Sequence, residues 1–217
     1  MKNILFVVLL LLSSTHCLAD NLQDALQGIE TEWASIYYGT PRQLQGSAYA
    51  TLLDKTVKLS RQYPKDTNAL FWQAVVKASY ADRQDPVSAL AAIYEVRDLL
   101  NKIITINPTT MNGSAYVVLG TLYHKAPAWP IAFGDDEKAS KSFQAALKIS
   151  PDGMDSNYYY GEFLLANNPL KDAEIYFKKA SVAPVRATQQ YADTQLQNAA
   201  KRALNTLGLE KSASTTP

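Results

Sequence analysis

The stretch that decides the fold is YVVLGTLY at residues 116–123, followed after an irregular loop by KASKSFQAALKISP at residues 138–151. In the first segment, one helical face carries two aromatic residues, an aliphatic and a glycine: Tyr116, Leu119, Gly120 and Tyr123. In the second, the spacing of Ala139, Phe143 and Ala146 predicts another helix, which Pro151 ends. Because a glycine inside a helix costs about 1 kcal/mol relative to alanine, Gly120 indicates close approach of a neighbouring helix. We therefore expect an antiparallel helical pair in which small residues pack against large ones.

This pattern recurs along the chain. Downstream, Gly161 precedes Ala173, Phe177 and Ala180, and Pro184 follows them. Two more degenerate copies lie upstream, at Phe71, Ala74, Val75, Ala78, Val96, Leu100 and Ile103 before Pro108, and at Trp33, Ile36, Tyr37, Leu52, Thr56 and Leu59 before Pro64. A single helical pair cannot bury its own apolar face, so the copies are expected to stack.

These positions resemble the signature of the tetratricopeptide repeat (TPR) family, with Tyr116 where tryptophan is common. The resemblance implies an all-α protein, an α-solenoid of about four TPR-like helical hairpins over residues 20–210 with a C-terminal capping helix over about 186–207. The segments EWASIYYG, APAWPIAFGDDEKA and NYYYGEFL also resemble small exported bacterial TPR proteins of poorly defined function. Residues 211–217 are small and polar, and we expect them to form a disordered tail.

The first residues predict a cleavable signal peptide over 1–19. Lys2 gives a basic start, an apolar run follows from Ile4 to Leu12, and small residues precede the expected cleavage after Ala19. The run is shorter than the ~20 residues of a membrane span, which disfavours a retained anchor. The residues before Cys17 do not fit a lipoprotein site. We expect a soluble periplasmic protein that begins at Asp20 and has no membrane span after cleavage.

The composition excludes several classes of function. After cleavage the chain contains no cysteine and keeps only His124 as a histidine, so a disulfide, a cysteine nucleophile and a thiolate metal site are excluded. Loss of Lys2 leaves 20 basic and 20 acidic residues, which argues against a nucleic-acid partner. No spacing in the sequence places a nucleophilic side chain beside a general base. We expect no catalytic residue, no metal site and no cofactor, and hence no enzyme.

In the TPR family the first helix of each unit lines a concave groove, so the resemblance implies a binding surface. Its residues here would be Trp72, Val76, Val117, Thr121, His124, Tyr158, Glu162 and Leu165. Such an apolar and aromatic surface without lysine or arginine favours an apolar helix or a lipid-like molecule. The alternative is that Trp72 and Tyr158 are core residues of a tightly wound array.

The insertion HKAPAWPIAFG at residues 124–134 is the second candidate site, with Trp129 and Phe133 as contact residues. It lengthens the turn inside the central helical pair, and its prolines and aromatics make it stiff and apolar. It either closes over the groove and supplies Trp129 as an anchor, or caps the edge of the stack.

Two functional hypotheses remain. The first is a non-catalytic periplasmic adaptor that binds a protein partner through the groove. The alternative is an accessory subunit of a substrate-binding-protein-dependent transporter that binds an apolar small molecule or lipid and associates with a transport partner. TPR arrays serve many unrelated partners, so the fold alone does not decide between them.

Overall fold

Stacked helical hairpins make up the computed structural model, which describes residues 21–167 and 170–214. A helix over residues 21–34 continues into a π-helical turn, η1 (Ser35–Gly39), and leads to α2. The remaining α-helices are α2 (Arg42–Gln62), α3 (Thr67–Ala81), α4 (Pro86–Ile106), α5 (Ser114–Lys125), α6 (Asp136–Ile149), α7 (Met154–Ala166), α8 (Leu170–Val182) and α9 (Gln190–Ser214). Short 3₁₀ turns, η2 (Thr110–Gly113) and η3 (Ala187–Gln189), precede α5 and α9.

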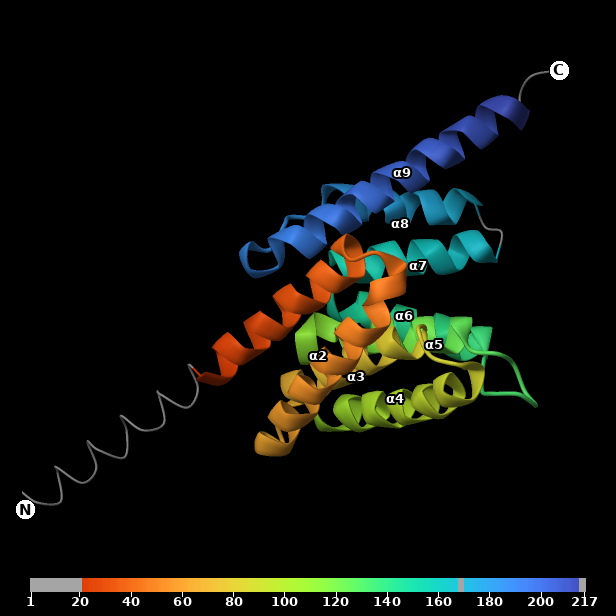
Figure 1. Cartoon of the computed structure of the whole chain (residues 1–217). Coiled ribbons are helices and arrows are strands. Elements are labelled where there is room, and N and C mark those ends of the chain that lie inside the picture. The colour runs from red at the N-terminus through yellow and green to blue at the C-terminus, as the bar shows by residue number, and fades with distance from the viewer. Residues whose placement is uncertain (1–20, 168–169, 215–217) are drawn as a thin grey trace, which may run out of the picture.

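The helices pair in sequence order. The first helix and α2, then α3 and α4, α5 and α6, and α7 and α8 form hairpins, and α9 packs on α7 and α8 (Figure 1). Within the described residues the only β feature is one isolated bridge between Ala128 and Gly134. The predicted all-α stack of about four hairpins with a C-terminal helix is confirmed. The final helix continues to Ser214, past its predicted end at Leu207.

Glycine positions allow the two best-formed hairpins to pack closely. A methyl group added at Gly120 of α5 would lie 3.0 Å from the ring of Phe143 on α6, and one at Gly161 of α7 would lie 3.0 Å from the ring of Phe177 on α8. Both phenylalanines are fully buried. The same small-against-large contact therefore repeats from one hairpin to the next, as the spacing of the sequence predicts.

Acidic N-caps and prolines set most helix boundaries. Asp66, Asp85 and Asp135 each accept backbone N–H bonds from the first turn of the helix that follows. The start of α5 has no side-chain cap. Met111 and Asn112 have left-handed backbone angles, Gly113 is the N-cap residue, and Ser114 Oγ donates to the Met111 carbonyl.

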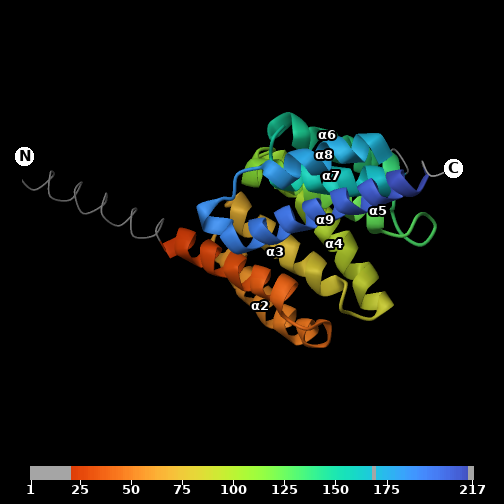
Figure 2. The same ribbon diagram turned by 90° about the horizontal axis from the view of Figure 1, so that it is seen from above.

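The two ends of the described chain meet and close the stack. Gln27 Nε2, on the first helix, donates to the Thr188 carbonyl at 2.6 Å, and the rings of Tyr38 and Tyr191 lie edge to face. Figures 1 and 2 show the first helix beside the start of α9, which crosses the hairpins diagonally. The array is therefore not an open solenoid, because its terminal helices cover one face.

Among the described residues, no helix combines the length and the apolar character needed to cross a membrane. The predicted signal peptide, residues 1–19, lies outside the described part of the chain.

Candidate functional site

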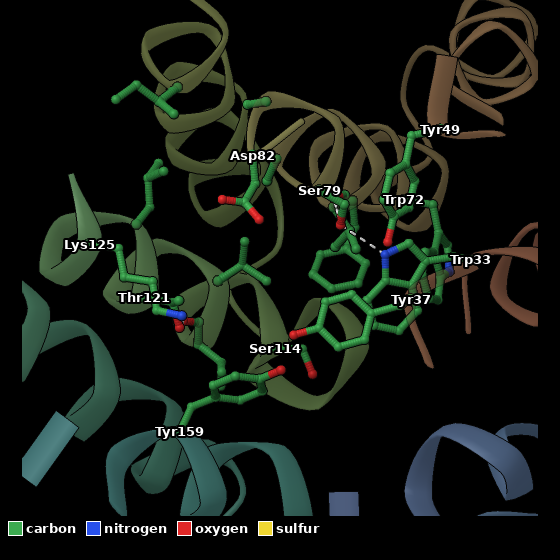
Figure 3. Close-up of a pocket in the computed structure, with 18 of the residues that line it drawn as sticks. Trp33, Tyr37, Tyr49, Trp72, Ser79, Asp82, Ser114, Thr121, Lys125 and Tyr159 are labelled. Carbon is green, nitrogen blue, oxygen red and sulfur yellow. Dashed lines mark hydrogen bonds between the residues drawn. The ribbon is translucent and has the colours of Figure 1, made fainter. Parts of the chain in front are cut away.

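A large pocket lies beneath the first helix and α9, which are called the closing helices below. Its volume is about 890 Å³, within the range of small-molecule sites in proteins. Every hairpin contributes to its wall, and the first helix and α9 complete it. Figure 3 shows side chains from the first helix, η1, α3 and α5 directed toward this common space, with Tyr159 of α7 opposite them.

Most of the lining is aromatic or aliphatic. The aromatic members are Trp33, Tyr37, Tyr38, Tyr49, Phe71, Trp72 and Tyr159, and the aliphatic ones include Val75, Leu90, Ile93, Val117, Val118, Leu122 and Leu196. An apolar wall of this extent stabilises a bound molecule chiefly by removing its apolar surface from water.

The aromatic side of the pocket is held in place by mutual contacts. Trp33 stacks on Tyr37 with ring centroids 5.1 Å apart and lies 5.8 Å from Trp72. Its indole Nε1 donates to Ser79 Oγ at 2.9 Å, a bond drawn in Figure 3. Because its N–H already has a partner within the protein, Trp33 presents ring surface to the pocket.

One end of the pocket is polar and is built around Arg186. Its guanidinium donates to both oxygens of Asp193 at 2.9 and 2.6 Å, and its backbone N–H donates to Asp193 Oδ2 at 2.8 Å. The same guanidinium reaches Asp155 Oδ1 at 3.3 Å, and Ser114 Oγ lies 3.3 Å from Asp155 Oδ2. Burial opposes the charge of Arg186, but the hydrogen bonds to Asp193 and the attraction of both carboxylates outweigh it and raise its pKa.

Glu30 lies at this polar end and is unusual among the described residues. The residue is only 7% exposed, and its Oε1 atom has no hydrogen-bond partner. Burial raises the pKa of Glu30 to about 7, against the opposing effects of Gln189 and Arg186, while Asp193 and Asp155 raise it further. In the described part of the chain, no group of three or more His, Cys, Asp or Glu side chains is arranged to hold a metal ion.

Three residues of the predicted groove line this pocket: Trp72, Val117 and Thr121. Trp72 belongs equally to the main hydrophobic core, so both interpretations of that residue describe part of its environment. Val76 is fully buried in the same core and does not line the pocket.

The other predicted groove residues lie elsewhere. Tyr158, Glu162 and Leu165 line a smaller cavity of about 270 Å³ beside α9. His124 Nδ1 is 2.7 Å from Asp136 Oδ1, and its ring packs edge to face on Phe163. The structure thus distributes the predicted groove residues among two cavities, the hydrophobic core and a hydrogen bond between His124 and Asp136.

The insertion has one packed and one exposed aromatic residue. Phe133 contacts the rings of Tyr94 and Tyr123, and Arg97 lies over its face at 4.7 Å. Trp129 is 85% exposed, while Pro127 and Ile131 of the same segment line the large pocket. The insertion therefore packs on α4 and α5 through Phe133 and reaches the pocket through Pro127 and Ile131.

The polar end of the pocket and the part of the first helix that lines it were not predicted from the sequence. Glu30, Tyr38, Arg186 and Asp193 come from segments assigned to the faintest repeat copy and to the capping helix. Helical periodicity describes neighbours in the stack, whereas these residues meet because the ends of the chain meet. The signal available in the sequence was the segment EWASIYYG, which carries three aromatic residues within eight positions, more than packing of a terminal repeat requires.

Comparison with known proteins gives two findings. A pentatricopeptide repeat-containing protein of Arabidopsis thaliana is 26% identical over 151 residues, which are 68% of this chain and 20% of that protein. The chain thus spans about a fifth of the length of this curated relative. A family model described as TAtT, TRAP transporter T-component, matches residues 31–207, which is most of the chain and includes all of the hairpins α3–α8. On this match, the chain belongs to the TRAP transporter T-component family.

Proposed function

We propose that this protein is a periplasmic accessory subunit of a transporter, and that it holds an apolar small molecule in the pocket beneath its closing helices. The observation that carries the proposal is the pocket itself, about 890 Å³ with a mainly apolar wall of aromatic and aliphatic side chains. Membership of the transporter family supports the accessory role. We also propose that the hairpins are tetratricopeptide repeats, which the repeated contacts Gly120–Phe143 and Gly161–Phe177 support.

The adaptor hypothesis placed a partner helix in an open groove. The terminal helices cover that face, and the resulting pocket has the dimensions of a small-molecule site rather than of a helix-binding groove. We therefore propose that protein partners, the other subunits of the transporter, contact the outer surface, while the pocket holds the small molecule.

Native mass spectrometry on protein purified from its own cells tests the pocket. We expect a retained small molecule in the wild type and its loss in Thr121→Trp, because the half-buried Thr121 side chain lines the pocket and an indole there occupies space that the bound molecule needs. Gln144→Trp is the matched control, since Gln144 is exposed on α6 outside the pocket. Wild-type protein of bare mass, with no small molecule in any preparation, would contradict the proposal.

A pull-down from envelope extract tests the partner. We expect transporter subunits to be retained by the wild type and by Thr121→Trp alike, because the proposed contact lies outside the pocket. A partner that depends on an unfilled pocket would restore the adaptor hypothesis.

A further inference from the structure

The polar end of the pocket has unused capacity to accept hydrogen bonds. Glu30 is more than nine-tenths buried, lines the pocket, and leaves Oε1 without a donor. A buried acceptor without a partner is unfavourable, so a donor is expected at this position in the functional state. The described residues supply no such donor to Oε1, and a bound molecule can.

The charges at this end favour a cation over an anion. Three carboxyl groups, Glu30, Asp155 and Asp193, face the single guanidinium of Arg186. Arg186 directs Nε and Nη2 at Asp193 and Nη2 also at Asp155, so its positive charge is already matched within the protein. An anionic group placed here would meet an excess of negative charge.

The surrounding wall suits a positively charged group as well. Trp33 lies one helical turn after Glu30 and presents its ring to the pocket, and Tyr159 and Ser114 adjoin Asp155. Figure 3 shows the hydroxyl ends of Tyr37, Tyr159 and Ser114 directed toward one another. Aromatic faces beside a carboxylate attract alkylammonium groups through cation–π interaction.

We infer that the molecule held in this pocket is an amphiphile with a protonated amine at one end, which donates to Glu30 while its apolar body lies against the aromatic wall. This inference rests on the proposed function, because it names the chemical class of the molecule bound at the same site. The ammonium group supplies the missing donor, and its charge balances the third carboxylate.

The inference has a defined pH dependence. An ammonium group binds the ionised form of Glu30, whose pKa is raised to about 7 by burial, with Gln189, Arg186, Asp193 and Asp155 as the facing polar groups. Amine affinity should therefore rise about tenfold between pH 6 and pH 8, as Glu30 loses its proton. A ligand that accepts the Glu30 proton, such as a carboxylate, would show the opposite trend.

Isothermal titration calorimetry with three matched probes tests the inference: decylamine, decanol and decanoate, each below its micellar concentration. We expect decylamine to bind most tightly at pH 8, at least about tenfold above decanoate, since a hydrogen bond to a charged group is worth about 1.5–3 kcal/mol. Glu30→Gln should lower decylamine affinity about tenfold and leave decanol affinity within about twofold.

Glu32→Gln is the control, because Glu32 lies on the same helix but pairs with Lys55 instead of lining the pocket. Thermal unfolding of each variant confirms that it is folded. Decanoate or decanol binding as tightly as decylamine, or unchanged decylamine affinity in Glu30→Gln, overturns the amine inference and leaves the proposed function intact. If none of the probes binds and no small molecule is retained in native protein, the proposed function fails and the inference with it.

Discussion

At the scale of single residues, glycine decides how closely the hairpins pack. Alanine usually stabilises a helix relative to glycine by about 1 kcal/mol. At Gly120 and Gly161, however, the added methyl would press on a fully buried phenylalanine ring. We expect Gly120→Ala and Gly161→Ala each to lower the free energy of unfolding by about 1–3 kcal/mol, measured by urea denaturation.

Two comparisons separate crowding from other effects. Gly28→Ala, in the first helix with no atom near the new methyl, should stabilise the protein by up to about 1 kcal/mol. Replacing Phe143 by leucine in the Gly120→Ala background should recover part of the loss. Stabilisation by Gly120→Ala would show that the helices do not approach as closely as described.

Glu30 makes stability depend on pH. Its carboxyl has a pKa of about 7 in the folded chain and an ordinary value of 4.5, so the folded state keeps the proton up to a higher pH than the unfolded state does. The free energy of unfolding of the wild type therefore falls as the pH rises from the unfolded-state pKa through the folded-state pKa, by up to about 3 kcal/mol in total. Relative to the wild type, Glu30→Gln should gain this much stability between pH 4 and pH 8, measured by urea denaturation at each pH. A difference independent of pH would contradict the burial of this carboxyl.

At the scale of elements, the insertion gives a prediction of its own. Trp129 is 85% exposed, so Trp129→Ala should change the melting temperature by less than about 1 °C. Phe133 packs between Tyr94, Tyr123 and Arg97, so Phe133→Ala should cost about 2 kcal/mol. Differential scanning calorimetry measures both effects. Equal losses of stability would contradict the assignment of Trp129 to the surface and Phe133 to the packed stack. Loss of transporter subunits from a pull-down with folded Trp129→Ala would make Trp129 a partner contact.

The elements themselves follow closely from the sequence, whereas the pocket does not. Helices α2, α4 and α6 each end two residues before Pro64, Pro108 and Pro151, because the residue before a proline is disfavoured in a helix. Local chemistry of this kind can be read within a few positions of the chain. The contacts that shape the pocket, such as Gln27 with Thr188, join residues from opposite ends, and no periodic pattern encodes them.

At the scale of the whole molecule, the two terminal helices convert the open concave face of a repeat array into a covered pocket. An open array exposes a concave face along its length, but here the first helix and α9 meet across that face. Arg186 connects this closure to the rest of the structure, because it binds Asp193 of α9 and Asp155 of α7. The Asp193 side chain is 1% exposed and that of Arg186 is 35% exposed, so the loss of Arg186 leaves a buried carboxylate without its counter-charge.

A double-mutant cycle on Arg186 and Asp193 tests this role. Arg186→Ala alone should lower the free energy of unfolding by about 3–5 kcal/mol, because the buried Asp193 carboxylate loses its counter-charge. Adding Asp193→Asn removes that uncompensated charge, so the double variant should lose about 1–3 kcal/mol less than the sum of the two single losses. Hydrogen exchange should rise in the first helix and the start of α9 in Arg186→Ala, before it rises in the buried helices α5 and α7. Additive losses, or exchange that rises evenly over all helices, would mean that this ion pair does not hold the closing helices over the pocket.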